Sequence, residues 1–135
     1  MDGEYIKPMS KKDLHRIEKA FKRKGGEIRY NSEAQEILNY QGAQGMTIDA
    51  KLILLRPNPS RATVFEELIH TSQFMRGALD SEPISIARCE VEAKKKLIKY
   101  AKAYGLSDAE VRETRKLLAM DIKQLEILEK RGVSE

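Results

Sequence analysis

The chain has one cysteine, no tryptophan and no apolar run long enough to span a membrane. Cys89 alone can form neither an internal disulfide nor a thiolate zinc cluster, and its place among apolar residues at helical spacing predicts a small core residue. Aromatic residues make up only 6%, so aliphatic side chains must fill the core. Met1 is followed by Asp2-Gly3-Glu4 and not by an apolar stretch, so we expect no signal peptide and no membrane anchor.

The remaining composition is that of a soluble globular protein with a highly charged surface. The 135 residues suffice for a buried core, and we expect residues 1–135 to form a single domain. The net charge is +4, and much of the positive charge lies in 7–24 and 94–102. These lysines alternate with acidic residues or face outward from amphipathic helices, which predicts a solvated face and disfavours nucleic-acid binding. An acidic protein partner, such as an immunity protein, is the second interpretation.

Apolar spacing and helix caps predict an α+β fold, a small sheet packed on helices with a C-terminal helical hairpin. The stretch Leu52–Leu55 is apolar on both faces, which predicts a buried strand that ends at Pro57. The run from Ser107 to Glu110 has the pattern of a capping box. The expected elements are helix 11–24, strand 27–30, a helix to 40 capped by Asn31 or Ser32, strand 46–56 (bent or a hairpin near 49–50), a helix to 75 capped by Ser60 or Thr63, helix 85–104 and helix 108–130.

The helix that follows Leu55 carries the residues that can bind a metal or take part in catalysis. At about 100° per residue, its apolar side chains form one face, while Glu66, His70 and Gln73 share another with Glu67 at its flank. Glu66 and His70 are one turn apart and can share a ligand. In an HExxH helix the first and last residues hold a metal and the second acts as base. Here Glu66 occupies the first ligand place, Glu67 the base place and His70 the second ligand place.

A zinc site of this kind needs a third protein ligand, and the next helix offers Glu90 and Glu92. Glu90 lies about 50° from the centre of that helix's apolar stripe and Glu92 about 110° away. A carboxylate on an inner face is costly unless it is paired or bound to metal. We therefore predict that Glu90 faces the core, with His70 as its partner, and that Glu92 faces solvent.

These residues resemble a known family. The run Ile53–Arg61, followed by Val64-Phe-Glu-Glu-Leu-Ile-His70 and Gln73, is similar to the zincin-like metallopeptidase toxin domains of bacterial polymorphic toxins and their phage relatives. In that family a later helix supplies a glutamate through an ExxA pattern, which Glu90-Val-Glu-Ala93 matches. The resemblance covers roughly 25–105. The departure from the general zincin motif is Glu66, where that motif has histidine.

The resemblance implies a zinc-dependent metallopeptidase acting on a peptide or protein, located in the cytoplasm or delivered within a larger toxin or phage protein. Glu66, His70 and Glu90 would bind the zinc, Glu67 would be the catalytic base and Gln73 would support the ligands. Two alternatives stay open. Glu90 and His70 can form a buried ion pair without metal, and the chain can be a non-enzymatic structural or interaction module, which Glu66 favours.

Overall fold

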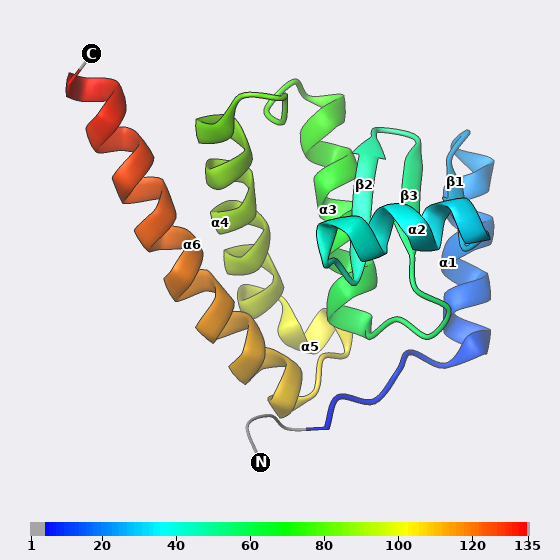
Figure 1. The fold of residues 1–135 in the computed structure, drawn as a ribbon. Helices are drawn as coiled ribbons and strands as arrows, with labels where there is room; N and C mark the ends of the chain where they lie inside the picture. The colour runs from blue at the N-terminus through cyan, green and yellow to red at the C-terminus, as the bar shows by residue number, and fades with distance from the viewer. Residues whose placement is uncertain (1–4, 135) are drawn as a thin grey trace.

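In a computed structural model, which describes residues 5–134, the chain adopts an α+β fold (Figure 1). The fold class predicted from the sequence is therefore confirmed. The elements in chain order are α1 (Lys11–Arg23), β1 (Glu27–Arg29), α2 (Ser32–Gln41), β2 (Gly45–Asp49), β3 (Leu52–Leu55), α3 (Arg61–Met75), α4 (Pro83–Lys99), α5 (Ala101–Tyr104) and α6 (Asp108–Ser134). None of the helices described is long and apolar enough to cross a bilayer.

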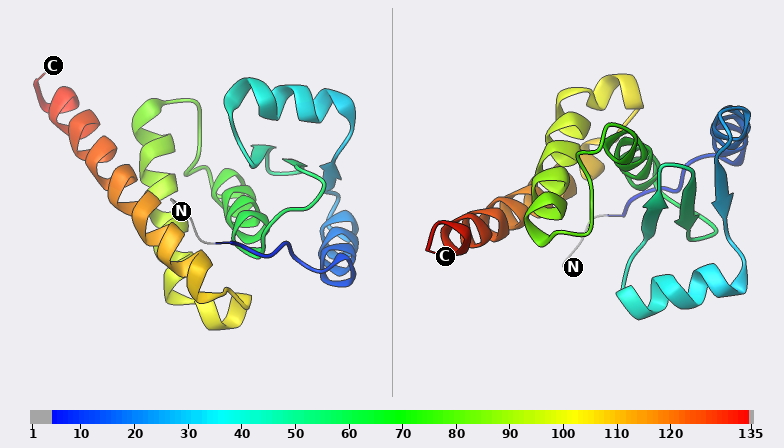
Figure 2. Two further views of the ribbon diagram at one scale, coloured as in Figure 1. Left: turned by 60° about the horizontal axis from the view of Figure 1, so that its bottom comes forward. Right: turned by 90° about the horizontal axis from the view of Figure 1, so that it is seen from above.

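The three strands form a mixed sheet in the order β1-β3-β2. β1 pairs with β3 in parallel, and β2 with β3 antiparallel, so the strand expected over 46–56 is a hairpin. Figure 2 shows α2 on one side of this sheet and α1 with α3 on the other. β2 is an edge strand whose outer backbone groups pair with no other strand of the described chain.

The central strand β3 is buried on both faces, as its apolar sequence predicts. Ile53 and Leu55 pack with Val64 of α3 and with side chains of α1. Leu54 points to the other face, where it meets Leu38 of α2. Successive side chains of a strand alternate between its faces, so a strand covered by helices on both sides needs apolar residues at every position.

Helix α3 lies between the sheet and α4, and α6 packs along the far side of α4 (Figure 1). Ile69 on α3 meets Ala93 and Leu97 on α4 in a third apolar cluster. The start of α3 is also fixed by α6, because the Glu110 carboxylate accepts hydrogen bonds from the Ala62 and Ser107 backbone N–H groups. Glu110 thus closes the predicted capping box and caps a second helix.

The last two helices differ in extent from the sequence prediction. The helix expected over 85–104 begins at Pro83 and is interrupted at Tyr100, where φ is −107°, before the short α5. The interruption accompanies two contacts of Tyr104: its ring lies 4.7 Å from the Phe65 ring, and its carbonyl accepts a hydrogen bond from Arg61. Tertiary packing against the start of α3 therefore replaces one continuous helix with two. Helix α6 runs to Ser134, beyond the expected end near 130.

Candidate metal centre

The three residues predicted as metal ligands lie together between α3 and α4. His70 Nε2 is 3.3 Å from Glu90 Oε1. One ligand atom from each of Glu66, His70 and Glu90 lies within 4.8 Å of the other two. Zinc bonds of about 2.0–2.2 Å in tetrahedral geometry separate neighbouring ligand atoms by about 3.4 Å, so the His70–Glu90 spacing needs almost no adjustment. The group could hold a metal ion, and its imidazole and carboxylate donors suit a divalent one.

Glu90, and not Glu92, lies beside His70, as the rotation argument predicted. The Glu90 side chain is 35% exposed and that of Glu92 51%. Glu92 instead forms an ion pair with Arg76 at the surface and accepts a hydrogen bond from Gln73. The geometry therefore puts the first glutamate of the ExxA pattern next to the imidazole.

Gln73 fixes the protonation pattern of His70. Its Oε1 lies 2.6 Å from His70 Nδ1, while its Nε2 donates a hydrogen bond to the Cys89 carbonyl oxygen, 3.0 Å away. A carbonyl can only accept, so the amide orientation is set, and His70 Nδ1 must carry the hydrogen. The Nε2 atom facing Glu90 is then the ring nitrogen whose lone pair a metal would use. The supporting role predicted for Gln73 thus has a geometric basis.

His70 and Glu90 shift each other's pKa in opposite directions. Burial lowers the pKa of His70, but the hydrogen bond and charge of Glu90 outweigh it and raise that pKa to about 9. Burial likewise raises the pKa of Glu90, yet His70 and then Lys94 bring it down to about 2. At neutral pH the metal-free pair is therefore an imidazolium beside a carboxylate.

Glu67, the predicted base, is buried against the edge strand. The Thr47 hydroxyl lies 2.9 Å from both Glu67 Oε1 and the Glu67 carbonyl oxygen. Burial raises the pKa of Glu67 to about 7, against the opposing attraction of His70. Gly45 allows the strand to approach so closely, since a Cβ there would lie 3.2 Å from Glu67 Cγ and 2.9 Å from a Leu55 methyl. A carboxyl that titrates near neutrality is suited to accept and return protons.

The sequence prediction was wrong about Lys94, which was assigned to a solvated basic face. Lys94 is 6% exposed, and its ammonium lies 2.8 Å from Glu90 Oε2, 3.1 Å from Glu66 Oε2 and 2.7 Å from Asp121 Oδ2. Because α4 is packed between α3 and α6, its buried arc is wider than that of a helix with one neighbour. The missed signal is spacing: Lys94 follows Glu90 by four residues and so shares its inward direction.

The cluster combines more negative than positive charge in a buried place. Burial raises the pKa of Glu66, and Lys94 opposes that rise. Glu66 Oε2 and Asp121 Oδ2 have no directed hydrogen bond from any described residue, although both are close to the ammonium. Three carboxylates therefore face one lysine, which leaves two negative charges that the lysine does not balance. A divalent cation beside a neutral His70 would balance them. The excess of buried carboxylate charge and the Glu66, His70 and Glu90 donor set fit a metal ligand role.

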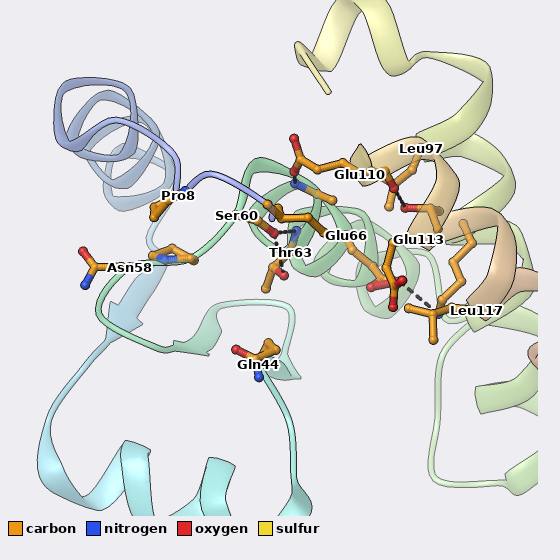
Figure 3. A pocket seen from close by; sticks show the side chains of 15 residues that line it. Pro8, Gln44, Asn58, Ser60, Thr63, Glu66, Leu97, Glu110, Glu113 and Leu117 are labelled. Carbon is orange, nitrogen blue, oxygen red and sulfur yellow. Dashed lines mark hydrogen bonds and ion pairs between the residues drawn. The ribbon is translucent and has the colours of Figure 1, made fainter. Parts of the chain in front are cut away.

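Two cavities meet at Glu66. One, of about 490 Å³, lies between the loop before α3 and helices α3, α4 and α6 (Figure 3). The other, of about 520 Å³, is lined by 45–47 of β2 together with Glu67, His70 and Glu90. Glu66 lines both. All three candidate ligands thus line the second cavity, which borders the free edge of β2, and Glu66 also lines the first.

Comparisons with known proteins add no relative: the chain matches no protein-family model, no curated protein and no solved structure. The resemblance to zincin-like toxin domains accordingly depends on the run Ile53–Arg61 and on the motif residues of α3 and α4. What the geometry adds to those motifs is the convergence of Glu66, His70 and Glu90 on one point.

Proposed function

We propose that this chain is a zincin-like, zinc-dependent metallopeptidase domain. The observation that carries the proposal is the convergence of Glu66, His70 and Glu90 within 4.8 Å, with Glu67 next to them at a pKa of about 7. A structural ion pair alone does not require a second buried carboxyl beside it, and such a carboxyl is costly to keep. The motif resemblance is the basis for assigning the domain to a bacterial toxin or phage protein.

The residues divide the chemistry of peptide hydrolysis among them. Glu66, His70 and Glu90 would hold the zinc, which when bound polarises a peptide carbonyl and makes a water more acidic. Glu67 removes one proton from the attacking water as its oxygen bonds to the carbonyl carbon. Glu67 then gives that proton to the amide nitrogen as the C–N bond breaks, so it ends the cycle unchanged. Gln73 keeps the imidazole in the tautomer that leaves Nε2 free.

The edge strand supports an extended peptide as the substrate class. The outer edge of β2 is free, and residues 45–47 line the cavity that contains Glu67 and His70. A free strand edge binds an extended chain through backbone hydrogen bonds, whatever the side chains of that chain are. A peptide lying along β2 would therefore pass directly over the candidate metal centre.

The proposal is tested by metal analysis and peptide cleavage together. Chain purified without chelator is expected to carry close to one zinc, to cleave members of a mixed peptide library, and to lose that activity after treatment with a chelator. Adding zinc back should restore it, with mass spectrometry of the fragments as the readout. Absence of cleavage at every metal concentration, in protein that binds zinc, would count against the peptidase and leave only a metal-binding domain.

A metal-free ion-pair cluster is the second candidate function. Lys94 favours it, because its ammonium already contacts Glu66, Glu90 and Asp121 and so joins α3, α4 and α6 without a metal. In that case the domain is a structural or interaction module. A calorimetric titration in which zinc and manganese give no binding heat would decide for this alternative.

The pKa of His70 predicts opposite pH trends for stability and for metal affinity. Its pKa is raised from 6.5 to about 9, so the stabilisation from the His70–Glu90 pair is complete below pH 6.5 and is lost as pH rises through 9. Zinc needs the neutral imidazole, so its affinity should rise about tenfold per pH unit up to pH 9. Between pH 6 and 8 the melting temperature of the metal-free chain should fall while zinc affinity rises roughly 100-fold. A flat affinity profile would contradict the assignment of His70 as a ligand.

A further inference from the structure

Lys94 forms ion pairs with two of the carboxylates that would bind the metal. Its ammonium contacts the Oε2 atoms of Glu66 and Glu90, and Glu90 Oε1 faces His70 Nε2. The ammonium donates a hydrogen bond to Glu90 Oε2, 2.8 Å away. The lysine is buried, and therefore cannot move into solvent without disturbing the packing of α4 against α3 and α6.

A positive charge in this position opposes a second cation. A metal held by Glu66 and Glu90 would share these carboxylates with the ammonium. The two cations would then lie close together in surroundings that screen charge less than water does. The lysine also orients the two carboxylates, and ligands that are already oriented bind a metal more tightly. Charge repulsion between a divalent ion and an ammonium is strong at short range in a buried site, so we expect the net effect of Lys94 to be weaker metal binding.

Asp121 contacts the lysine from a different helix. It reaches in from α6, with Oδ2 2.7 Å from the ammonium, and is not among the residues whose ligand atoms converge with His70. It therefore shares the ammonium with Glu66 and Glu90 and lessens the hold of each on it. Without it, Lys94 would bind those two carboxylates more completely.

We propose that Lys94 is a resident cation of the Glu66–Glu90 cluster that limits its affinity for divalent metal, and that Asp121 moderates this competition. The inference rests on the proposed function, because it concerns the same metal centre. It makes Lys94 a residue that determines metal affinity without itself binding the metal, and it gives helix α6 a part in the site.

The test compares Lys94→Met, Asp121→Asn and the double variant in the full chain, with zinc affinity measured by calorimetry and folding checked by circular dichroism. Lys94→Met should tighten zinc binding roughly tenfold to a hundredfold, a usual range for coupling between two ligands. Asp121→Asn should weaken it several-fold. Both changes break the same ion pair, so a purely structural role would shift the two affinities in the same direction.

The double variant separates two routes by which Asp121 could act. If Asp121 works through Lys94, the double variant should bind zinc as tightly as Lys94→Met alone. If Asp121 instead attracts the metal directly, the double variant should be weaker than Lys94→Met, and its moderating role through the lysine is refuted. If Lys94→Met does not fold, Lys94→Gln, which also removes the charge, takes its place, and zinc binding no tighter than that of the original chain refutes the inference. An unchanged affinity in Asp121→Asn refutes the moderating role of Asp121.

Failure of this inference is distinguishable from failure of the proposed function. Zinc binding by the original chain with equal or weaker binding by Lys94→Met refutes the inference and leaves the metal centre intact. Zinc binding by Lys94→Met but not by the original chain supports the inference and shows that the native domain excludes metal. No binding by any folded variant refutes both.

Discussion

Replacing Glu67 with glutamine is expected to lower peptide cleavage by roughly 10²- to 10⁴-fold, the usual contribution of a positioned general base. Glutamine has nearly the same shape and can still accept a hydrogen bond from the Thr47 hydroxyl, but it cannot take a proton from water. Zinc affinity should change little, because Glu67 is not one of the converging ligands. The measurement is the cleavage rate of one peptide at saturating zinc.

The same substitution should make the protein more stable, which separates a chemical effect from unfolding. The folded state raises the pKa of Glu67 from 4.5 to about 7, so its charged form destabilises the fold as pH rises through that range, and the cost is complete above pH 7. Glu67→Gln removes the cost, and the melting temperature at pH 8 should increase. Glu36→Gln, an exposed change on α2, is the matched control and should alter neither property. Cleavage at the original rate by Glu67→Gln would refute its role as base.

Replacing His70 with alanine is expected to weaken zinc binding by roughly 100- to 1000-fold. The reason is that zinc binding energies of about 10–16 kcal/mol in structural sites with four protein ligands correspond to about 2.5–4 kcal/mol for each ligand. His70 is the only neutral nitrogen ligand of the set, so its loss also removes the donor that best distinguishes zinc from harder cations. Competition with a chromogenic zinc chelator at pH 8 measures the change.

His15→Ala is the matched control for this experiment, since the chain has two histidines and His15 is exposed on α1. It should leave zinc affinity unchanged. The His70→Ala chain removes the partner of Gln73 Oε1 and one of the two partners of Glu90, so its stability must be measured beside its affinity. Equal zinc affinity in the His70 and His15 variants would mean that zinc binds elsewhere on the chain.

The proposed roles place a stability cost and a charge conflict in one small region. Glu67 is held at an unfavourable pKa, and Lys94 is enclosed by three carboxylates. Buried charges and strongly shifted pKa values are more frequent at functional sites than elsewhere, and structural ion-pair networks are the other place where they occur. The variants of Glu67 and Lys94 distinguish these interpretations because each predicts a gain in one property: stability for Glu67→Gln and zinc affinity for Lys94→Met.

The sequence by itself determined the features that depend on neighbouring residues along the chain. Helical periodicity put Glu66 and His70 on one face of α3, and the apolar run Leu52–Leu55 identified the buried strand before it. The same rotation rule selected Glu90 over Glu92, since the direction of a side chain on a helix depends only on its distance from the apolar stripe. These predictions required no knowledge of which helix lies next to which.

Only the tertiary structure decided what surrounds the site. Thr47 meets Glu67, and Asp121 meets Lys94, because β2 packs against α3 and α6 against α4. Residues far apart in the chain come together through packing, which local spacing does not encode. The burial of Lys94 has the same cause, since a helix with two packed neighbours encloses side chains that one neighbour would leave in water. The motif thus specified the candidate metal ligands, and the packing of α6 on α4 buried Lys94 beside two of them and brought Asp121 to it.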